Sequence, residues 1–261
     1  MRLLELPAAR SASAFRGRRR ARNISARGRL GQRPETVPFT RSDPLPRTDV
    51  ILFDLDGTLV DSADLILESY RHTMRVHFEE VPPDSVWLRS LGTPLRAQFR
   101  EFVDTDDEVQ AMIETYIEHN HREHARLIRR FPGVRETLEA LLGRGARLGI
   151  VTSKAARGTA ISLESCGIPA EWFEVVITSD EPVPHKPDPA PVRLALEQLG
   201  VPPDLASFVG DSVWDIRAGL AAGVHTVAAL WGPFSEDELA PERPHRMIDR
   251  PSDLLEDPDS E

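Results

Sequence analysis

Two aspartates separated by one residue, Asp54 and Asp56, directly follow the apolar segment Val50-Ile51-Leu52-Phe53. In an extended backbone both side chains point to the same side. Carboxylates this close repel each other unless a cation or a proton neutralises them. Mg²⁺ prefers oxygen ligands and leaves coordination positions for a phosphate. The pair therefore predicts a cation site that handles a phosphoryl group, the alternative being a surface Asp turn that caps a helix.

Three other segments carry side chains suited to the same chemistry, each at the end of an expected strand. Thr152 and Ser153 follow Ile150-Val151, where hydroxyl and backbone N–H groups can hold phosphate oxygens, although ordinary helix capping has the same pattern. Asp211 follows Ser207-Phe208-Val209-Gly210, and Asp215 comes four residues later at the start of an expected helix. These two carboxylates would complete an oxygen-rich Mg²⁺ shell, with helix capping again the alternative.

Lys186 lies in the segment His185-Lys186-Pro187-Asp188-Pro189, where its ammonium could neutralise charge that develops on a phosphoryl group. A solvated loop lysine is the alternative. The chain has 30 arginines but only two lysines, Lys154 and Lys186, and both fall in these candidate loops. This bias favours a function that needs ammonium geometry.

The sequence around these residues predicts alternating strands and helices, which must position them. Short apolar segments suited to buried strands lie at 50–53, 148–151, 175–177, 207–209 and 226–230, and amphipathic helical patterns cover 134–142, 156–166, 191–199 and 214–222. Such alternation predicts an α/β fold with a Rossmann-like parallel sheet covered on both faces. We expect this core to comprise residues 48–62 and 131–250.

The segment 63–130 breaks the alternation, because it has helical patterns around Leu65–Phe78 and Val109–Ile117 and no convincing strand. It predicts an inserted α-helical cap over the carboxyl ends of the strands, where open α/β sheets bind ligands. Residues 251–261 read as a frayed acidic tail. Residues 1–47 are expected to form a disordered basic arm, although the Arg- and Ser-rich stretch 10–33 has the composition of an organelle transit peptide.

Composition limits the function classes further. The net charge of −10 makes nucleic-acid binding unlikely as the main activity, although residues 1–47 hold 12 arginines against three carboxylates. No apolar run reaches the roughly 18 residues of a membrane span, so no membrane partner is expected. The one cysteine, Cys166, cannot form an internal disulfide, and a reducing cytoplasm is the expected location. The oligomeric state stays open.

The segment Asp54-Leu55-Asp56-Gly57-Thr58, Thr152, Lys186-Pro187 and Gly210-Asp211 with Asp215 occur in the order and approximate spacing of the haloacid dehalogenase superfamily. The chain resembles the phosphatase branch of that superfamily over about residues 49–232. The resemblance implies that Asp54 is the nucleophile of a Mg²⁺-dependent phosphatase and that Asp56 is the general acid and base. It further implies that Thr152 binds the phosphate and that Lys186 neutralises its oxygens. Asp54, the carbonyl of Asp56, Asp211 and Asp215 would hold the Mg²⁺.

We expect Gly57, Thr58, Ser153 and Arg96 to contact a small phosphorylated metabolite. Arg96 belongs to a segment, 91–96, that resembles the loop lowered into the site by capped relatives, although a solvated arginine is equally compatible with its position. Cap residues 69–73 and 116–124 are similar to inorganic pyrophosphatase relatives, whereas the core is equally similar to phosphoglycolate phosphatases. A phosphosugar mutase of the same superfamily and a non-catalytic binding protein are the alternative functions.

Overall fold

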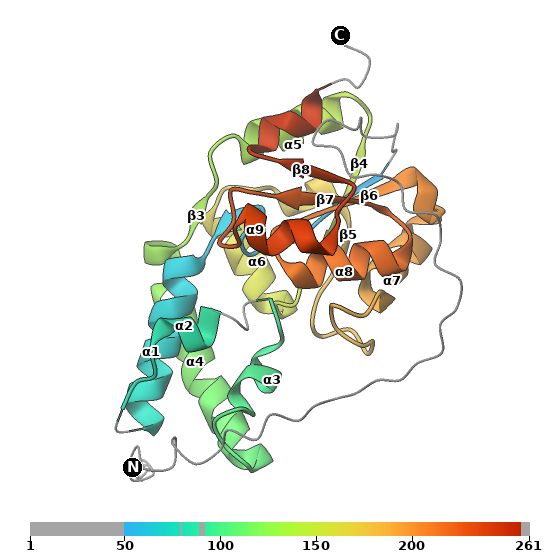
Figure 1. The fold of residues 1–261 in the computed structure, drawn as a ribbon. Coiled ribbons are helices and arrows are strands. Elements are labelled where there is room, and N and C mark those ends of the chain that lie inside the picture. The colour runs from blue at the N-terminus through green and yellow to red at the C-terminus, as the bar shows by residue number, and fades with distance from the viewer. Residues whose placement is uncertain (1–49, 79, 89–91, 257–261) are drawn as a thin grey trace, which may run out of the picture.

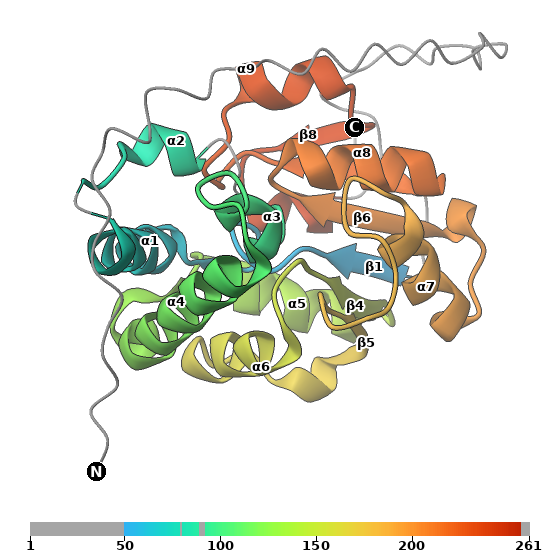
Figure 2. The same cartoon turned by 90° about the horizontal axis from the view of Figure 1, so that it is seen from below.

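The computed structural model describes residues 50–78, 80–88 and 92–256. Six parallel strands form one sheet in the order β5-β4-β1-β6-β7-β8. They are β1 (Val50–Phe53), β4 (Arg147–Val151), β5 (Phe173–Ile177), β6 (Ala206–Gly210), β7 (His225–Ala229) and β8 (Arg246–Ile248). The predicted Rossmann-like α/β core is confirmed, and helices lie above and below the sheet (Figures 1 and 2).

Both faces of the sheet are buried, which explains why the strands read as continuous apolar runs. Ile51 and Phe53 of β1 pack on one face against α5 (Val134–Gly143) and α6 (Ala156–Ser165). Val50 and Leu52 point the other way and pack against α7 (Ala190–Leu199) and α8 (Val213–Ala222). The short helix α9 (Glu236–Leu239) packs over β7 and β8.

Four helices follow β1 and β2 in the chain and precede β3: α1 (Ala63–His77), α2 (Asp84–Leu88), α3 (Leu95–Phe99) and α4 (Asp106–Leu127). They have their own apolar core, in which the rings of Tyr70 and Trp87 stack with centroids 3.8 Å apart. Helices α1 and α4 lie side by side beyond the end of the sheet (Figure 1). This is the helical insertion expected over residues 63–130.

A two-stranded antiparallel ribbon joins the helical insertion to the sheet domain. It pairs β2 (Val60–Asp61) with β3 (Arg129–Arg130), so the two chain crossings lie next to each other. The expectation of no strand between 63 and 130 is therefore wrong at its last two residues. Strands of two residues carry no periodicity that a sequence pattern could reveal.

The C-terminal segment also differs from expectation. Residues Pro251–Leu255 form a 3-10 helix, η5, in which Leu254 is buried against α5 and Asp253 caps the turn through the backbone N–H groups of Asp249 and Arg250. The expected frayed tail is thus ordered as far as residue 256. The described part of the chain also contains the 3-10 helices η2 (Ala170–Trp172), η3 (Pro203–Leu205) and η4 (Ala240–Glu242).

The basic arm expected at residues 1–47 and the tail beyond residue 256 lie outside the described residues. Within residues 50–256, apart from the gaps given above, no helix combines the length and the apolar character that crossing a bilayer requires.

Candidate active site

The candidate residues lie at the carboxyl edge of the sheet, where the strand order changes direction. From β1 the chain moves outward through β4 to β5, then returns to β6 on the other side of β1. Loops after β1 and β6 therefore diverge and leave a crevice, the usual ligand position in open α/β sheets. Asp54 follows β1, Thr152 follows β4, and Asp211 follows β6.

Lys186 is buried in this crevice, and its ammonium group donates three hydrogen bonds. Its Nζ donates hydrogen bonds to Asp54 Oδ1 at 2.8 Å, Asp215 Oδ1 at 2.6 Å and the carbonyl oxygen of Val151 at 3.2 Å. Only 4% of the residue is exposed. Burial alone would lower the pKa of Lys186, but the charges of Asp215 and Asp54 outweigh burial and raise it. The lysine is therefore a fixed cation.

Asp215 opens helix α8 and is fixed by the helix itself. Its Oδ2 accepts hydrogen bonds from the backbone N–H of Ser212 at 3.0 Å and from the Ser212 hydroxyl at 2.5 Å, in a capping box. Gly210 lies so close that a Cβ there would collide with the Asp215 side chain. Helix capping, the alternative considered for this aspartate, is thus present together with its contact to Lys186.

Asp211 is held by the loop after β1. The Thr58 hydroxyl donates to Asp211 Oδ1 at 2.7 Å, and the Thr58 carbonyl accepts from Trp231 Nε1 at 2.9 Å. Gly57 has φ of +95°, and a Cβ at this position would overlap the Asp211 carboxylate. Glycine is therefore required here both by its backbone conformation and by the close approach of Asp211.

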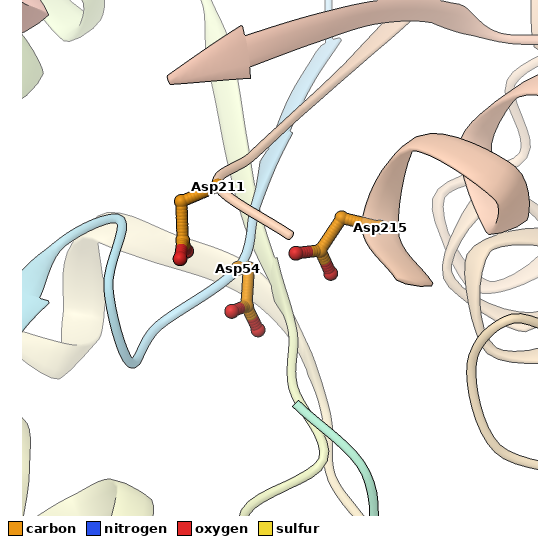
Figure 3. Close-up of side chains that lie close together, drawn as sticks. All are labelled: Asp54, Asp211 and Asp215. Atoms are coloured by element: carbon orange, nitrogen blue, oxygen red, sulfur yellow. The ribbon is translucent and has the colours of Figure 1, made fainter. Parts of the chain in front are cut away.

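The three carboxylates of Asp54, Asp211 and Asp215 converge (Figure 3), each contributing an oxygen within 4.8 Å of the others. Burial raises the pKa of Asp54 to about 7; Lys186 opposes this, whereas Asp215 adds to it. Burial, followed by the charges of Asp215 and Asp54, raises the pKa of Asp211 well above its usual value. One ammonium does not balance this group, so the donor set fits a hard divalent cation such as Mg²⁺.

Asp56 pairs with Lys154, the other lysine of the chain. Lys154 Nζ lies 2.8 Å from Oδ1 and 3.0 Å from Oδ2 of Asp56. The lysine side chain lies along helix α6 over Gly158, where a Cβ would approach its carbons to 3.2 Å. The structure thus joins Lys154, which the lysine bias singled out, to one of the two aspartates after β1.

Thr152 and Ser153 line the same cavity on the β4 side. Thr152 is 5% exposed, and its hydroxyl accepts a hydrogen bond from the backbone N–H of Lys154 at 3.2 Å. The Ser153 hydroxyl is buried and has no hydrogen-bond partner among the residues that the structure describes. A buried hydroxyl without a partner is costly, so this position suits an incoming acceptor such as a phosphate oxygen.

Core and cap enclose a cavity of about 600 Å³ above the carboxylates. Arg96 of α3 lines it from the cap, is 54% exposed at its side chain, and donates to Gln110 Oε1 of α4 at 2.9 Å. Sequence reasoning missed much of the remaining wall, because these side chains come from separate helices and loops whose packing no local pattern predicts. That wall includes Ile66, Trp87, Gln98, Tyr116, Arg157 and Phe234.

The charged and histidine side chains of the cap differ in their positions relative to the cavity. Arg71 pairs with Asp84 and Glu68 outside the cavity, whereas His121 lies on the cavity wall. His119 stacks on His72 and does not join other histidines in a ligand cluster. Among the described residues, the aspartate cluster is the one group of three or more side chains with metal-ligand geometry.

Comparison with known proteins agrees with this geometry. A family model described as haloacid dehalogenase-like hydrolase matches residues 51–229. The protein named pyrophosphatase PpaX from Bacillus pumilus is 38% identical over 208 residues, covering 79% of this chain and 94% of that protein. The protein of the same name from Bacillus velezensis is 38% identical over 209 residues, covering 80% and 95%.

Solved structures give the same result. A haloacid dehalogenase-like hydrolase from Bacteroides fragilis aligns with a TM-score of 0.74 and 27% identity, covering 79% of this chain and 99% of that one. A protein from Haemophilus somnus described as a "predicted phosphoglycolate phosphatase" aligns with a TM-score of 0.73 and 26% identity, covering 80% and 97%. From its motifs, its sheet order and these matches, the chain belongs to the haloacid dehalogenase-like hydrolases.

Proposed function

We propose that the protein is a Mg²⁺-dependent phosphatase that hydrolyses a small phosphorylated metabolite through a covalent aspartyl-phosphate on Asp54. The observation that carries this proposal is the position of Asp54. Its carboxylate is buried, Lys186 is bound to Oδ1, and Asp211 and Asp215 are grouped beside it. A carboxylate in that position has a fixed cation for the phosphoryl oxygens and a second carboxylate oxygen free to attack phosphorus.

Asp54, Asp211 and Asp215, together with the carbonyl of Asp56, would hold Mg²⁺. The ion would supply positive charge against the phosphoryl oxygens and keep Asp54 ionised. This assignment rests on the buried aspartate cluster and on the raised pKa of Asp54 and of Asp211, which is caused first by burial and to a smaller extent by the neighbouring carboxylates. Asp215 Oδ1 also accepts from Lys186 and its Oδ2 accepts from Ser212, so we propose that Asp215 orients Lys186 in addition to holding the ion.

The reaction needs two proton transfers, which we assign to Asp56. An oxygen of Asp54 forms a bond to phosphorus while the bond from phosphorus to the leaving oxygen breaks and Asp56 gives that oxygen a proton. Asp56, now a carboxylate, takes a proton from water as the water oxygen bonds to phosphorus; the bond from phosphorus to Asp54 breaks, which restores the Asp54 carboxylate and releases phosphate. The contact with Lys154 positions the Asp56 carboxylate at the cavity wall for the second transfer.

The phosphate would be bound by groups on three loops. We propose that the Thr152 and Ser153 hydroxyls donate to its oxygens, that Lys186 neutralises them, and that Gly57 brings the loop after β1 close to them. The unpartnered Ser153 hydroxyl supports this arrangement. Thr58 was expected to contact the substrate, but its hydroxyl already donates to Asp211, so we now propose that it positions this carboxylate.

Further cations on the cavity wall support a proposal for the substrate class. Lys154, Arg157 and His121 approach one another there, since both cations lower the pKa of His121 after the larger effect of burial. Arg96 adds a further cation from α3. These side chains would suit a substrate with a second anionic group, such as pyrophosphate or a 2-phosphoglycolate-like monoester. The names of the Bacillus and Haemophilus relatives support the same two candidates.

The deciding experiment measures phosphate release from pyrophosphate, 2-phosphoglycolate and phosphosugars with and without Mg²⁺. Asp54→Asn, checked for native fold by circular dichroism, is the control. We expect Mg²⁺-dependent release that this variant loses. If ¹⁸O from labelled water does not enter the released phosphate while phosphosugars are interconverted, the enzyme is a mutase. If Mg²⁺ binds and no compound is turned over, the phosphatase proposal is wrong and the protein is a non-catalytic binding protein.

The single cysteine, buried Cys166, supports a reducing compartment, and we propose the cytoplasm.

A further inference from the structure

A chain of buried polar side chains crosses the boundary between the sheet domain and the cap. His124, in the last turn of α4, is 1% exposed, and its Nε2 lies 3.0 Å from the Ser162 hydroxyl on α6 of the core. On its other side, His124 Nδ1 lies 3.2 Å from Asn120 Oδ1. Asn120 Nδ2 in turn donates to the Ser69 hydroxyl on α1 at 3.3 Å. Figure 2 shows the end of α4 beside α6.

The direction of each hydrogen bond follows from the donors and acceptors available. Because the Asn120 amide nitrogen donates to Ser69, the Asn120 oxygen must accept, so His124 carries its proton on Nδ1. His124 Nε2 is then the acceptor, and the Ser162 hydroxyl donates to it. Asn120 lies beside the Tyr116 side chain, which is one turn earlier in α4. The donors and acceptors are thus set along the whole chain of groups, from Ser69 in the cap to Ser162 in the core.

The far end of this chain is the wall of the active-site cavity. Tyr116, Asn120 and His124 are spaced four residues apart and share one face of α4. Tyr116 and Asn120 both line the cavity above Asp54, whereas Ser162 and His124 lie at the joint. A contact between α4 and α6 made of apolar side chains would be at least as stable, since buried hydrogen-bonded groups add little free energy of folding over apolar ones. What the polar chain adds is a fixed orientation of two cavity-wall side chains.

We propose that His124 is a positioning residue that orients Asn120 and Tyr116 at the cavity wall only while the end of α4 rests against Ser162 of the core. The cavity wall is then complete only in the closed arrangement of cap and core. This proposal rests on the proposed function only in using phosphate release as one of two measurements.

The chain offers a matched pair of hydroxyl deletions on helix α6. Ser162→Ala removes the core end of the polar chain. Thr159→Val removes another buried hydroxyl of the same helix, one with no hydrogen-bond partner among the described residues. His124→Gln tests the middle of the chain independently, in case one variant does not fold. All variants are first compared by circular dichroism and thermal melting.

The first measurement is the distance between cap and core, which requires no substrate. Spin labels are attached at Glu114→Cys on α4 and Glu197→Cys on α7, two exposed positions. Cys166→Ser removes the one native thiol. We expect one dominant distance in this background and with Thr159→Val. With Ser162→Ala or His124→Gln we expect an additional population at longer distance. Unchanged distances in both variants would overturn the proposal, whatever the enzyme hydrolyses.

The second measurement separates positioning from loss of folded protein. If only a tenth of the molecules hold a complete cavity wall, the apparent KM rises about tenfold while kcat falls less, because saturating substrate selects the closed form. We expect this pattern for Ser162→Ala and His124→Gln, and kinetics within about twofold of the parent for Thr159→Val. An equal loss of activity in all three variants would mean that activity depends on the packing of helix α6 and not on the polar chain. This result would overturn the proposal.

Discussion

The ammonium group of Lys186 lies 2.8 Å from Asp54 Oδ1, with both side chains more than nine-tenths buried. The same nitrogen contacts Asp215 at 2.6 Å, so one cation from the loop after β5 holds carboxylates from β1 and α8 in place. This contact fixes one oxygen of Asp54, and the carboxylates of Asp211 and Asp215 lie beside it. In the proposed mechanism, the contact would hold Asp54 ready for attack before any substrate arrives.

Removing this cation should cost stability as well as activity. Lys186→Met leaves two buried carboxylates without their partner, and breaking a buried ion pair costs about 3–5 kcal/mol. Chemical denaturation should therefore show a loss of that order. The other lysine is the matched control: Lys154→Met breaks a pair that retains solvent contact, and should cost about 1 kcal/mol. Equal losses for both variants would contradict the described role of Lys186.

Neutralising one carboxylate of the aspartate cluster should stabilise the metal-free protein. Asp211→Asn keeps the Thr58 hydrogen bond but removes one of the repelling charges. In EDTA we expect stabilisation by about 1 kcal/mol, which raises Tm by about 2–4 °C for a chain of this size. Added Mg²⁺ should raise the Tm of the parent protein but not that of the variant. The exposed Asp204→Asn serves as control, and a Mg²⁺ response retained by Asp211→Asn would exclude Asp211 as a ligand.

Gly57 should be intolerant of any side chain for reasons specific to the site. Gly57→Ala introduces a Cβ that meets the Asp211 carboxylate, in addition to the strain of a positive φ. Gly133→Ala shares the positive φ, +81°, but its Cβ would meet no atom within 4 Å. Calorimetric titration should show Mg²⁺ binding weakened at least about tenfold in Gly57→Ala. In Gly133→Ala we expect lower stability with unchanged Mg²⁺ binding; the reverse pattern would contradict the geometry.

His124 should make the protein less stable as the pH falls below neutrality. Burial, followed by the charge of Lys154, lowers its pKa from 6.5 to about 4 in the folded state. The unfolded chain binds the proton first, so this contribution is complete above pH 6.5 and declines as the pH falls toward 4. Between pH 7 and pH 5 the loss is about 1–2 kcal/mol. Urea denaturation of His124→Gln should show a smaller pH dependence over that interval, and an unchanged slope would contradict a buried neutral histidine.

Sequence patterns could predict the parallel sheet, the helical insertion and the side chains around Asp54, because each depends on local signals. Asp54 and Asp211 each end an apolar segment, and parallel strands bring such ends to one edge. The pairing of Thr58 with Asp211, 153 residues apart, could not be predicted, since it depends on how two loops pack. Strand β8 was missed because Arg246-Met247-Ile248 is too short to show a pattern.

The covalent step is tested most directly by rapid acid quench with ³²P-labelled substrate from the panel above, followed by peptide mapping. Asp56→Asn with labelled pyrophosphate is the informative combination, because phosphate leaves without needing a proton from Asp56, whereas the attacking water lacks its proton acceptor, so that the aspartyl-phosphate should accumulate. The proposed mechanism predicts Mg²⁺-dependent label on the peptide that contains Asp54, and none when Asp54→Asn is added. Label on another residue, or full turnover by Asp54→Asn, would contradict it.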